Sequence, residues 1–259
     1  MESTTTFKDA VREMGGVTVR VERRVLHWIA PRLPKAVNPD HLTGLAMAAM
    51  ALAGASYWLA GSQVWALWLV NLCLAINWFG DSLDGTLARI RQQQRPRYGF
   101  YVDHVVDAAG LTLLLGGMAL SGYITPIVAF VLLAAYLLLC VEVYLATYTL
   151  GTFTMSFFKV GPTELRILLA IGNAATFFLH PDPHVRVLGV AARLFDVAGL
   201  LAIAGLLVAF VVAVVGRTMT LYRLEPLTAA LKDGPTSPAP HRPDTPHHLA
   251  ATAHPSVQG

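Results

Sequence analysis

Six apolar segments, each close to the length needed to cross a bilayer, constrain the fold of this chain most strongly. They run roughly over residues 42–60, 64–83, 101–120, 124–148, 163–180 and 194–216. Segments of this length cross a membrane as helices, because the hydrocarbon core holds no water to pair with backbone polar groups. The sequence is 55% hydrophobic and 14% charged, whereas soluble domains have about 25% charged residues. We therefore predict an all-α integral membrane protein with six transmembrane helices.

The two ends of the chain differ from this apolar part. Val17 to Leu33 mixes apolar residues with arginines, which predicts an N-terminal amphipathic helix at the membrane interface. A solvated juxtamembrane helix is the alternative. We do not expect the N-terminus to be a signal peptide, because no apolar run follows Met1 closely. Residues 224–259 are rich in Pro, His, Thr and Ala, and this composition predicts a disordered tail. The expected division is therefore 1–37, 38–223 and 224–259.

The distribution of Lys and Arg predicts the orientation in the membrane. Seven of these bases precede residue 38, four lie within 89–98, and four follow residue 216. The short connectors Gly61-Ser62 and Ser121-Gly122 contain none, although the 181–193 connector holds two. Since bases accumulate on the cytoplasmic side, we expect a multi-pass protein of the inner or plasma membrane with both termini in the cytoplasm. An isoelectric point near 9.0 therefore reflects topology and does not indicate nucleic-acid binding.

Four carboxylates lie beside or inside the apolar segments. Asp81 and Asp84 are three residues apart, and Asp103 and Asp107 are four apart, so each pair lies on one helix face. A charge at membrane depth requires a partner or a function, and no cluster of buried bases matches these acids. Two such faces turned toward each other would form an all-oxygen site suited to Mg²⁺ or Mn²⁺. Four carboxylates suffice for two ions.

Around these acids the sequence resembles the CDP-alcohol phosphotransferases, also called the CDP-alcohol phosphatidyltransferase family. The signature of that family is D-x2-D-G-x2-A-R, about eight further residues, and G-x3-D-x3-D. It is matched here at Asp81, Asp84, Gly85, Ala88, Arg89, Gly99, Asp103 and Asp107. The spacer, Ile90 to Tyr98, has nine residues, and we expect it to be a loop, where one extra residue is tolerated.

The resemblance implies a transferase of substituted phosphate groups that acts in phospholipid synthesis. It would move a substituted phosphoryl group from a CDP-linked donor to an alcohol acceptor and release CMP. The resemblance also implies two divalent ions, Mg²⁺ or Mn²⁺, and assigns Asp107 as the catalytic base. Residues 38–223 would then be the catalytic domain, with the active site on the cytoplasmic side. Further implied partners are membrane lipids, at least one lipidic substrate, and a second copy of the chain in a homodimer. No nucleic-acid partner is expected.

The same resemblance suggests the nucleotide contacts. Asn38 to Thr43 reads N-P-D-H-L-T, similar to the P-[ND]-x-x-T pattern at the start of the first span in the family. This similarity implies that Asp40 and Thr43 lie near the nucleotide, while helix capping is the alternative. Arg89 would pair with phosphate oxygens. The expected nucleotide site comprises Asp40, Thr43, Asp81, Gly85, Ala88, Arg89 and Gly99.

The acceptor is harder to locate. The segment from Met155 to Arg166 separates the fourth and fifth apolar segments. Its polar residues could recognise the acceptor, or could anchor the chain at the membrane and cap a helix. Asn77 shares a face with Asp81 and could bond another helix or the substrate. The candidate acceptor contacts are Glu142, Ser156, Lys159, Glu164 and Arg166. Inositol phosphate, glycerol phosphate, serine, choline, ethanolamine and diacylglycerol are all consistent acceptors.

Two other functions would also use clustered acids in a membrane. A membrane prenyltransferase pairs Asp-rich motifs with Mg²⁺ on a prenyl diphosphate, which Asn77, Asp81 and Asp84 faintly resemble. The D-G-x2-A-R half of the motif argues against it. A cation transporter would need acids along a path across the bilayer, whereas these acids gather at one face. Release of CMP would separate the three functions.

Overall fold

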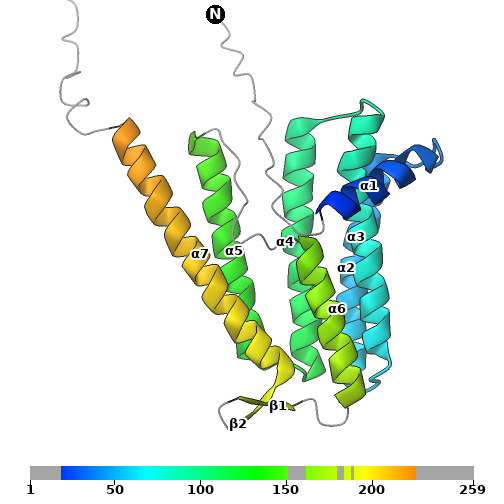
Figure 1. Ribbon diagram of the computed structural model, residues 1–259, viewed down its shortest axis with the longest axis vertical. Coiled ribbons are helices and arrows are strands. Elements are labelled where there is room, and N and C mark those ends of the chain that lie inside the picture. Colours follow the sequence, from blue (N-terminus) through cyan, green and yellow to red (C-terminus); the bar gives the residue numbers. More distant parts are fainter. Residues whose placement is uncertain (1–18, 151–161, 180–183, 188–189, 226–259) are drawn as a thin grey trace, which may run out of the picture. The chain divides into compact units, whose positions relative to one another are not determined.

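The computed structural model describes residues 19–150, 162–179, 184–187 and 190–225. These residues form seven α-helices, one 3₁₀ turn and one two-stranded hairpin (Figure 1). The elements are α1 (Val19–Ile29), η1 (Ala30–Arg32), α2 (Pro39–Ala60), α3 (Ala66–Ile90), α4 (Pro96–Ser121), α5 (Pro126–Leu150), α6 (Pro162–Leu179), β1 (His184–Val187), β2 (Val190–Arg193) and α7 (Leu194–Leu224). The chain divides into two compact units, residues 1–218 and 219–259. The described part of the second unit is the end of α7 and Glu225.

Five helices of the described chain, α2, α3, α4, α5 and α7, are long and apolar enough to cross a membrane. They confirm an all-α integral membrane protein. The sixth predicted span, 163–180, is helical as α6, but α6 has only 18 residues and includes Glu164, Arg166 and Asn173. These polar residues lower its hydropathy, so the count of six spans stays a prediction.

Helix boundaries follow local sequence signals. Asn38 caps α2, because its side chain accepts a hydrogen bond from the backbone N–H of His41, and Pro39 occupies the first helical position. α4 starts at Pro96, earlier than its apolar residues predict. The expected loop, 90–98, therefore shortens to residues 91–95, and Gly99 lies within the first turns of α4. α3 continues through Arg89 to Ile90, as predicted.

A close backbone contact joins α2 to α4 at two glycines. A Cβ placed on Gly117 would lie 1.9 Å from the carbonyl oxygen of Gly54, so the two backbones touch. Small residues allow such approach between membrane helices. Around this contact, Tyr57, Leu67 and Leu114 are buried in the main apolar core.

Two amides and a buried hydroxyl, linked by hydrogen bonds, attach α6 to α2 and α3. Tyr57 on α2 donates its hydroxyl hydrogen to Oδ1 of Asn173 on α6, at 2.7 Å. Asn173 in turn donates to Oδ1 of Asn71 on α3, at 2.7 Å. Hydrogen bonds of this kind join helices where apolar contacts alone are no better than contacts with lipid.

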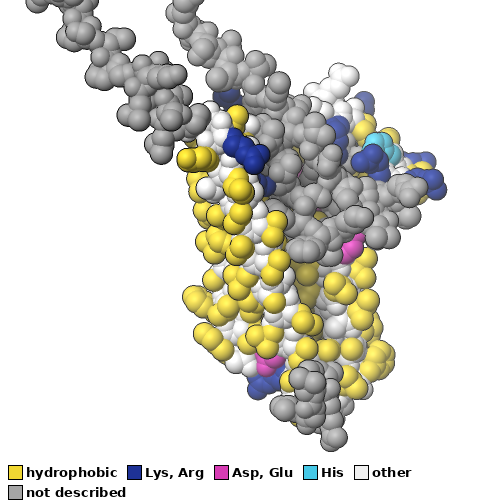
Figure 2. All heavy atoms as spheres, turned by 60° about the vertical axis from the view of Figure 1, so that its left-hand side comes forward, with side chains coloured by type: hydrophobic (Ala, Val, Ile, Leu, Met, Phe, Trp, Pro, Cys, Tyr) yellow, Lys and Arg dark blue, Asp and Glu magenta, His cyan; other side chains and the backbone are white. Residues whose placement is uncertain are grey.

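α5 and α7 are joined by polar contacts. Near the start of α7, Asp196 accepts hydrogen bonds from the backbone N–H and the hydroxyl of Thr125, at 2.5 and 2.8 Å. Further along, Arg217 forms an ion pair with Glu142 of α5. Many apolar side chains of both helices are exposed. Figure 2 shows them covering one face, with Lys and Arg gathered toward the helix ends, as expected for a surface in contact with lipid.

Two features outside the spans complete the fold. β1 and β2 pair antiparallel, with Val187 opposite Val190, in a connector for which the sequence predicted no strands. α1 is amphipathic as predicted: Leu26 is buried with Leu83 and Leu87 of α3, whereas Arg24 and Trp28 are exposed.

Candidate metal and nucleotide site

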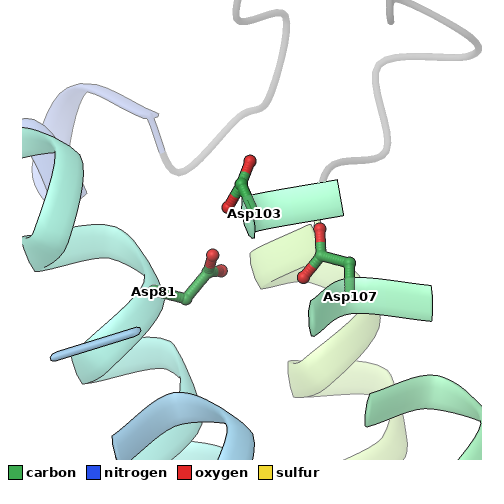
Figure 3. A group of neighbouring side chains, drawn as sticks. All are labelled: Asp81, Asp103 and Asp107. Atoms are coloured by element: carbon green, nitrogen blue, oxygen red, sulfur yellow. The ribbon is translucent and has the colours of Figure 1, made fainter. Parts of the chain in front are cut away.

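Three carboxylates from two helices meet at one point. Asp81 of α3 and Asp103 and Asp107 of α4 each offer an oxygen atom, and these atoms all lie within 4.8 Å of one another. Figure 3 shows the three carboxylates directed toward a common space. All three residues are partly buried. Carboxylates this close repel one another unless a cation lies between them, and an all-oxygen donor set suits Mg²⁺ or Mn²⁺. The donors present therefore fit a hard divalent ion.

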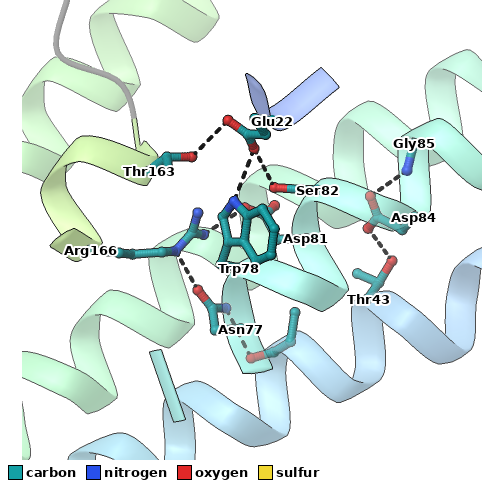
Figure 4. Close-up of polar contacts among 11 residues, drawn as sticks. Glu22, Thr43, Asn77, Trp78, Asp81, Ser82, Asp84, Gly85, Thr163 and Arg166 are labelled. Atoms are coloured by element: carbon teal, nitrogen blue, oxygen red, sulfur yellow. Dashed lines mark hydrogen bonds and ion pairs between the residues drawn. The ribbon is translucent and has the colours of Figure 1, made fainter. Parts of the chain in front are cut away.

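The fourth acid, Asp84, lies outside this group of three. Its Oδ2 accepts a hydrogen bond from the hydroxyl of Thr43, at 2.7 Å, and its Oδ1 accepts one from the backbone N–H of Gly85, at 2.5 Å (Figure 4). Residues three apart on a helix are offset by about 60°, so Asp84 reaches toward α2 while Asp81 faces α4. Thr43, expected at the nucleotide, thus contacts an acid of the family signature.

Asp81 also has a basic partner. Arg166 of α6 forms an ion pair with Oδ2 of Asp81, at 2.6 Å, and donates through Nε to Oδ1 of Asn77, at 2.8 Å. Asn77 donates to the backbone carbonyl of Ala46 on α2, at 3.1 Å. One predicted acceptor contact, Arg166, therefore lies directly against the carboxylate cluster. Asn77 forms a bond between helices, which is one of the two roles that the sequence left open for it.

The other residues expected at the nucleotide include Asp40 near the start of α2, Arg89 near the end of α3 and Gly99 near the start of α4. Asp40 forms an ion pair with Arg95, which raises the pKa of that guanidinium above its ordinary value. Arg89 is exposed and donates to the hydroxyl of Thr86, at 3.2 Å. A Cβ on Gly99 would meet nothing within 4 Å, so this side of α4 is open in the described residues.

The remaining signature and acceptor residues have varied surroundings. Ala88 is partly buried, and a Cβ on Gly85 would lie 3.6 Å from Nη1 of Arg89. Glu142 pairs with Arg217. Glu164 lies in the first turn of α6. Ser156 and Lys159 lie outside the described residues.

Two residues that the sequence did not single out hold the parts of the site together. Arg91, just after α3, donates to the backbone carbonyls of Leu33 and Pro34, each at 3.0 Å, and to that of Val37. Glu22 of α1 accepts hydrogen bonds from side chains of both α3 and α6. Neither belongs to a motif, and their partners are distant in sequence, so no local pattern could have indicated them.

Comparison with known proteins agrees with this geometry. Residues 36–196 match the family model described as CDP-alcohol phosphatidyltransferase. The match covers more than half of the chain and includes all four acids. No curated protein matches the chain.

Proposed function

Since the chain belongs to the CDP-alcohol phosphatidyltransferase family, we propose that it transfers a substituted phosphoryl group from a CDP-linked donor to an alcohol and releases CMP. The family itself supports a membrane phosphotransferase of phospholipid synthesis. The observation that carries the proposal is the meeting of Asp81, Asp103 and Asp107, whose spacing matches the family signature and whose oxygen atoms lie within 4.8 Å of one another.

The acids explain why such a reaction would take place here. Two Mg²⁺ or Mn²⁺ ions bound to Asp81, Asp84, Asp103 and Asp107 would neutralise the diphosphate of the donor and stabilise in-line displacement at phosphorus. Thr43 and the N–H of Gly85 orient Asp84 toward α2, so this carboxylate would turn toward the other three acids to act as a ligand.

The remaining steps belong to side chains of the chain itself. Asp107 takes the proton of the acceptor hydroxyl as that oxygen forms its bond to phosphorus, and the bond between phosphorus and the CMP oxygen breaks. Arg89 pairs with phosphate oxygens. Gly85, Ala88 and Gly99 leave room for the nucleotide, which Asp40 also contacts.

The acceptor binds near Arg166, with Glu142, Ser156, Lys159 and Glu164 as further candidate contacts. A guanidinium beside the carboxylates suits an anionic head group or phosphate. The site opens to the cytoplasm, where both termini lie, so that a water-soluble nucleotide meets a lipid partner at the inner or plasma membrane. The active protein is a homodimer.

A substrate panel tests the proposal. Purified protein in detergent receives Mg²⁺ or Mn²⁺, one donor (CDP-diacylglycerol, CDP-choline or CDP-ethanolamine) and one alcohol, and CMP is measured. The expected result is metal-dependent CMP release with one donor–acceptor pair, which also identifies the substrates. Absence of CMP with every pair, while the protein still binds Mn²⁺, would contradict the proposal and favour a prenyl diphosphate substrate or ion transport.

A further inference from the structure

Glu22 places a carboxylate of the surface helix α1 between two helices of the site. Its Oε1 accepts hydrogen bonds from Nε1 of Trp78, at 3.1 Å, and from the hydroxyl of Ser82, at 2.8 Å, both on α3. Its Oε2 accepts one from the hydroxyl of Thr163 on α6, at 3.1 Å. Figure 4 shows the three donors converging on this carboxylate. One side chain thus joins α1, α3 and α6.

The partners of Glu22 immediately flank an ion pair of the candidate site. Trp78 and Ser82 lie three residues before and one residue after Asp81, and Thr163 lies three residues before Arg166. Residues three apart share a helix face, so the carboxylate holds α6 against α3 one turn from the point where Arg166 meets Asp81, at 2.6 Å.

α1 is itself firmly seated, which gives Glu22 a fixed position. Leu26 and Ala30 follow Glu22 at intervals of four residues. Both are buried against Leu83 and Leu87 of α3. Burial of these apolar groups holds the helix down. On the C-terminal side of Arg166, Asn71 of α3 donates to the backbone carbonyl of Ala170, at 3.3 Å, and accepts from Asn173. Glu22 attaches the start of α6 on the other side of Arg166, through Thr163.

We propose that Glu22 is a positioning residue for the transfer reaction: by holding Thr163 and α3 together, it keeps Arg166 aligned with Asp81 and Asn77. The surface helix α1 thereby sets the geometry at the acceptor side of the carboxylate cluster. The inference rests on the proposed function, because Arg166 acts there as an acceptor contact.

Variants of Glu22 separate this role from a general contribution to folding. Glu22→Ala removes all three hydrogen bonds. Glu22→Gln keeps an oxygen for the two donors of α3, and its amide nitrogen can donate to the hydroxyl of Thr163, so this variant removes the charge and keeps the capacity for three hydrogen bonds. The matched control is Arg24→Ala, a change at an exposed residue of the same helix. Each variant is made both in the wild-type protein and in an Arg166→Ala background.

The measurements are CMP release, with CDP-diacylglycerol as donor and glycerol 3-phosphate or another alcohol of the panel as acceptor, and hydrogen exchange of α6 amides without substrates. We expect Glu22→Ala to lower kcat/KM for the acceptor about tenfold, the size usual for residues that orient a ligand-contacting group. KM for the donor should change less than about twofold. Glu22→Gln should show a smaller loss, and Arg24→Ala none.

Non-additivity decides whether Glu22 acts through Arg166. In the Arg166→Ala background, Glu22→Ala should cost little further activity, because the group it positions is gone. Equal losses in both backgrounds, or an equal rise of KM for donor and acceptor, would overturn the inference. If the wild-type protein releases no CMP, the proposed function fails. The exchange data still test whether Glu22 holds α6 in place: amides of Arg166 to Leu168 should exchange faster in Glu22→Ala than in the wild type, and unchanged exchange would refute the inference.

Discussion

Replacing Gly117 with alanine tests whether the close contact of α2 and α4 positions the acidic cluster. The new Cβ would lie 1.9 Å from the carbonyl oxygen of Gly54 and 2.4 Å from its carbon. An ordinary contact begins at 3.4 Å, so the helices must separate by about 1.5 Å, because backbone atoms cannot rotate aside as side chains do. Since α4 carries Asp103 and Asp107, the separation would also move them away from Asp81.

The neighbouring Gly116 provides a matched control, because a Cβ there would meet nothing within 4 Å. Both substitutions gain the same helix propensity, about 1 kcal/mol, so their difference isolates the steric cost. Overpacking costs about 1–3 kcal/mol, and rigid backbone on both sides places Gly117→Ala near the upper end. For a chain of this size, about 3 kcal/mol lowers Tm by about 6–12 °C.

The assay is thermal unfolding of the purified variants in one detergent, followed by Mn²⁺ binding below Tm. We expect Gly117→Ala to unfold earlier than Gly116→Ala by the stated interval and to bind Mn²⁺ more weakly. Equal Tm values for the two variants would refute the claim that the glycine contact sets the helix spacing. A lower Tm with unchanged Mn²⁺ affinity would refute its link to the acids.

Three further substitutions test single side chains. Asp107→Asn should reduce CMP release at least about 100-fold while nucleotide binding, measured by calorimetry, changes little; equal loss of both would count against its role as the base. Thr43→Val removes the hydroxyl that Asp84 accepts from and should lower turnover about tenfold, whereas wild-type turnover would show that this contact is dispensable. Tyr57→Phe breaks the bond to Asn173 and should cost about 1 kcal/mol of stability without changing kcat in the same CMP assay; a changed kcat would show that this bond affects the site.

Much of the helical fold could be predicted because its signals are local. Apolar length indicates the spans, Pro39 and Asn38 mark a helix start, and spacing along one helix places Asp103 and Asp107 on one face. α4 starts earlier than the sequence predicts because polar residues such as Arg97 precede its apolar part, although Pro96 suits the first helical position. The hairpin of β1 and β2 is not predictable from the sequence, because four-residue strands give too short a pattern.

Contacts between helices were less predictable, since they depend on how the helices pack. The ion pair of Asp81 with Arg166 joins residues far apart in sequence, and the predicted topology indicated only that the segment ending at Arg166 lies on the same side of the membrane as the acids. The i, i+3 spacing suggested that Asp84 would join the same group as Asp81, but the offset of about 60° between them lets Asp84 reach Thr43 instead. Glu22 belongs to no motif, and its role emerges only when α1 lies against α3 and α6.

The central claim is that the carboxylates of α3 and α4 hold divalent ions used in phosphoryl transfer. The most direct test is CMP release as a function of Mn²⁺ concentration, for the wild-type protein beside Asp81→Ala and Asp103→Ala, each shown by its unfolding transition to be folded. The account predicts saturable, Mn²⁺-dependent release by the wild type and none above background for either variant. Near-normal release by a folded variant, or release by the wild type in excess chelator, would contradict it.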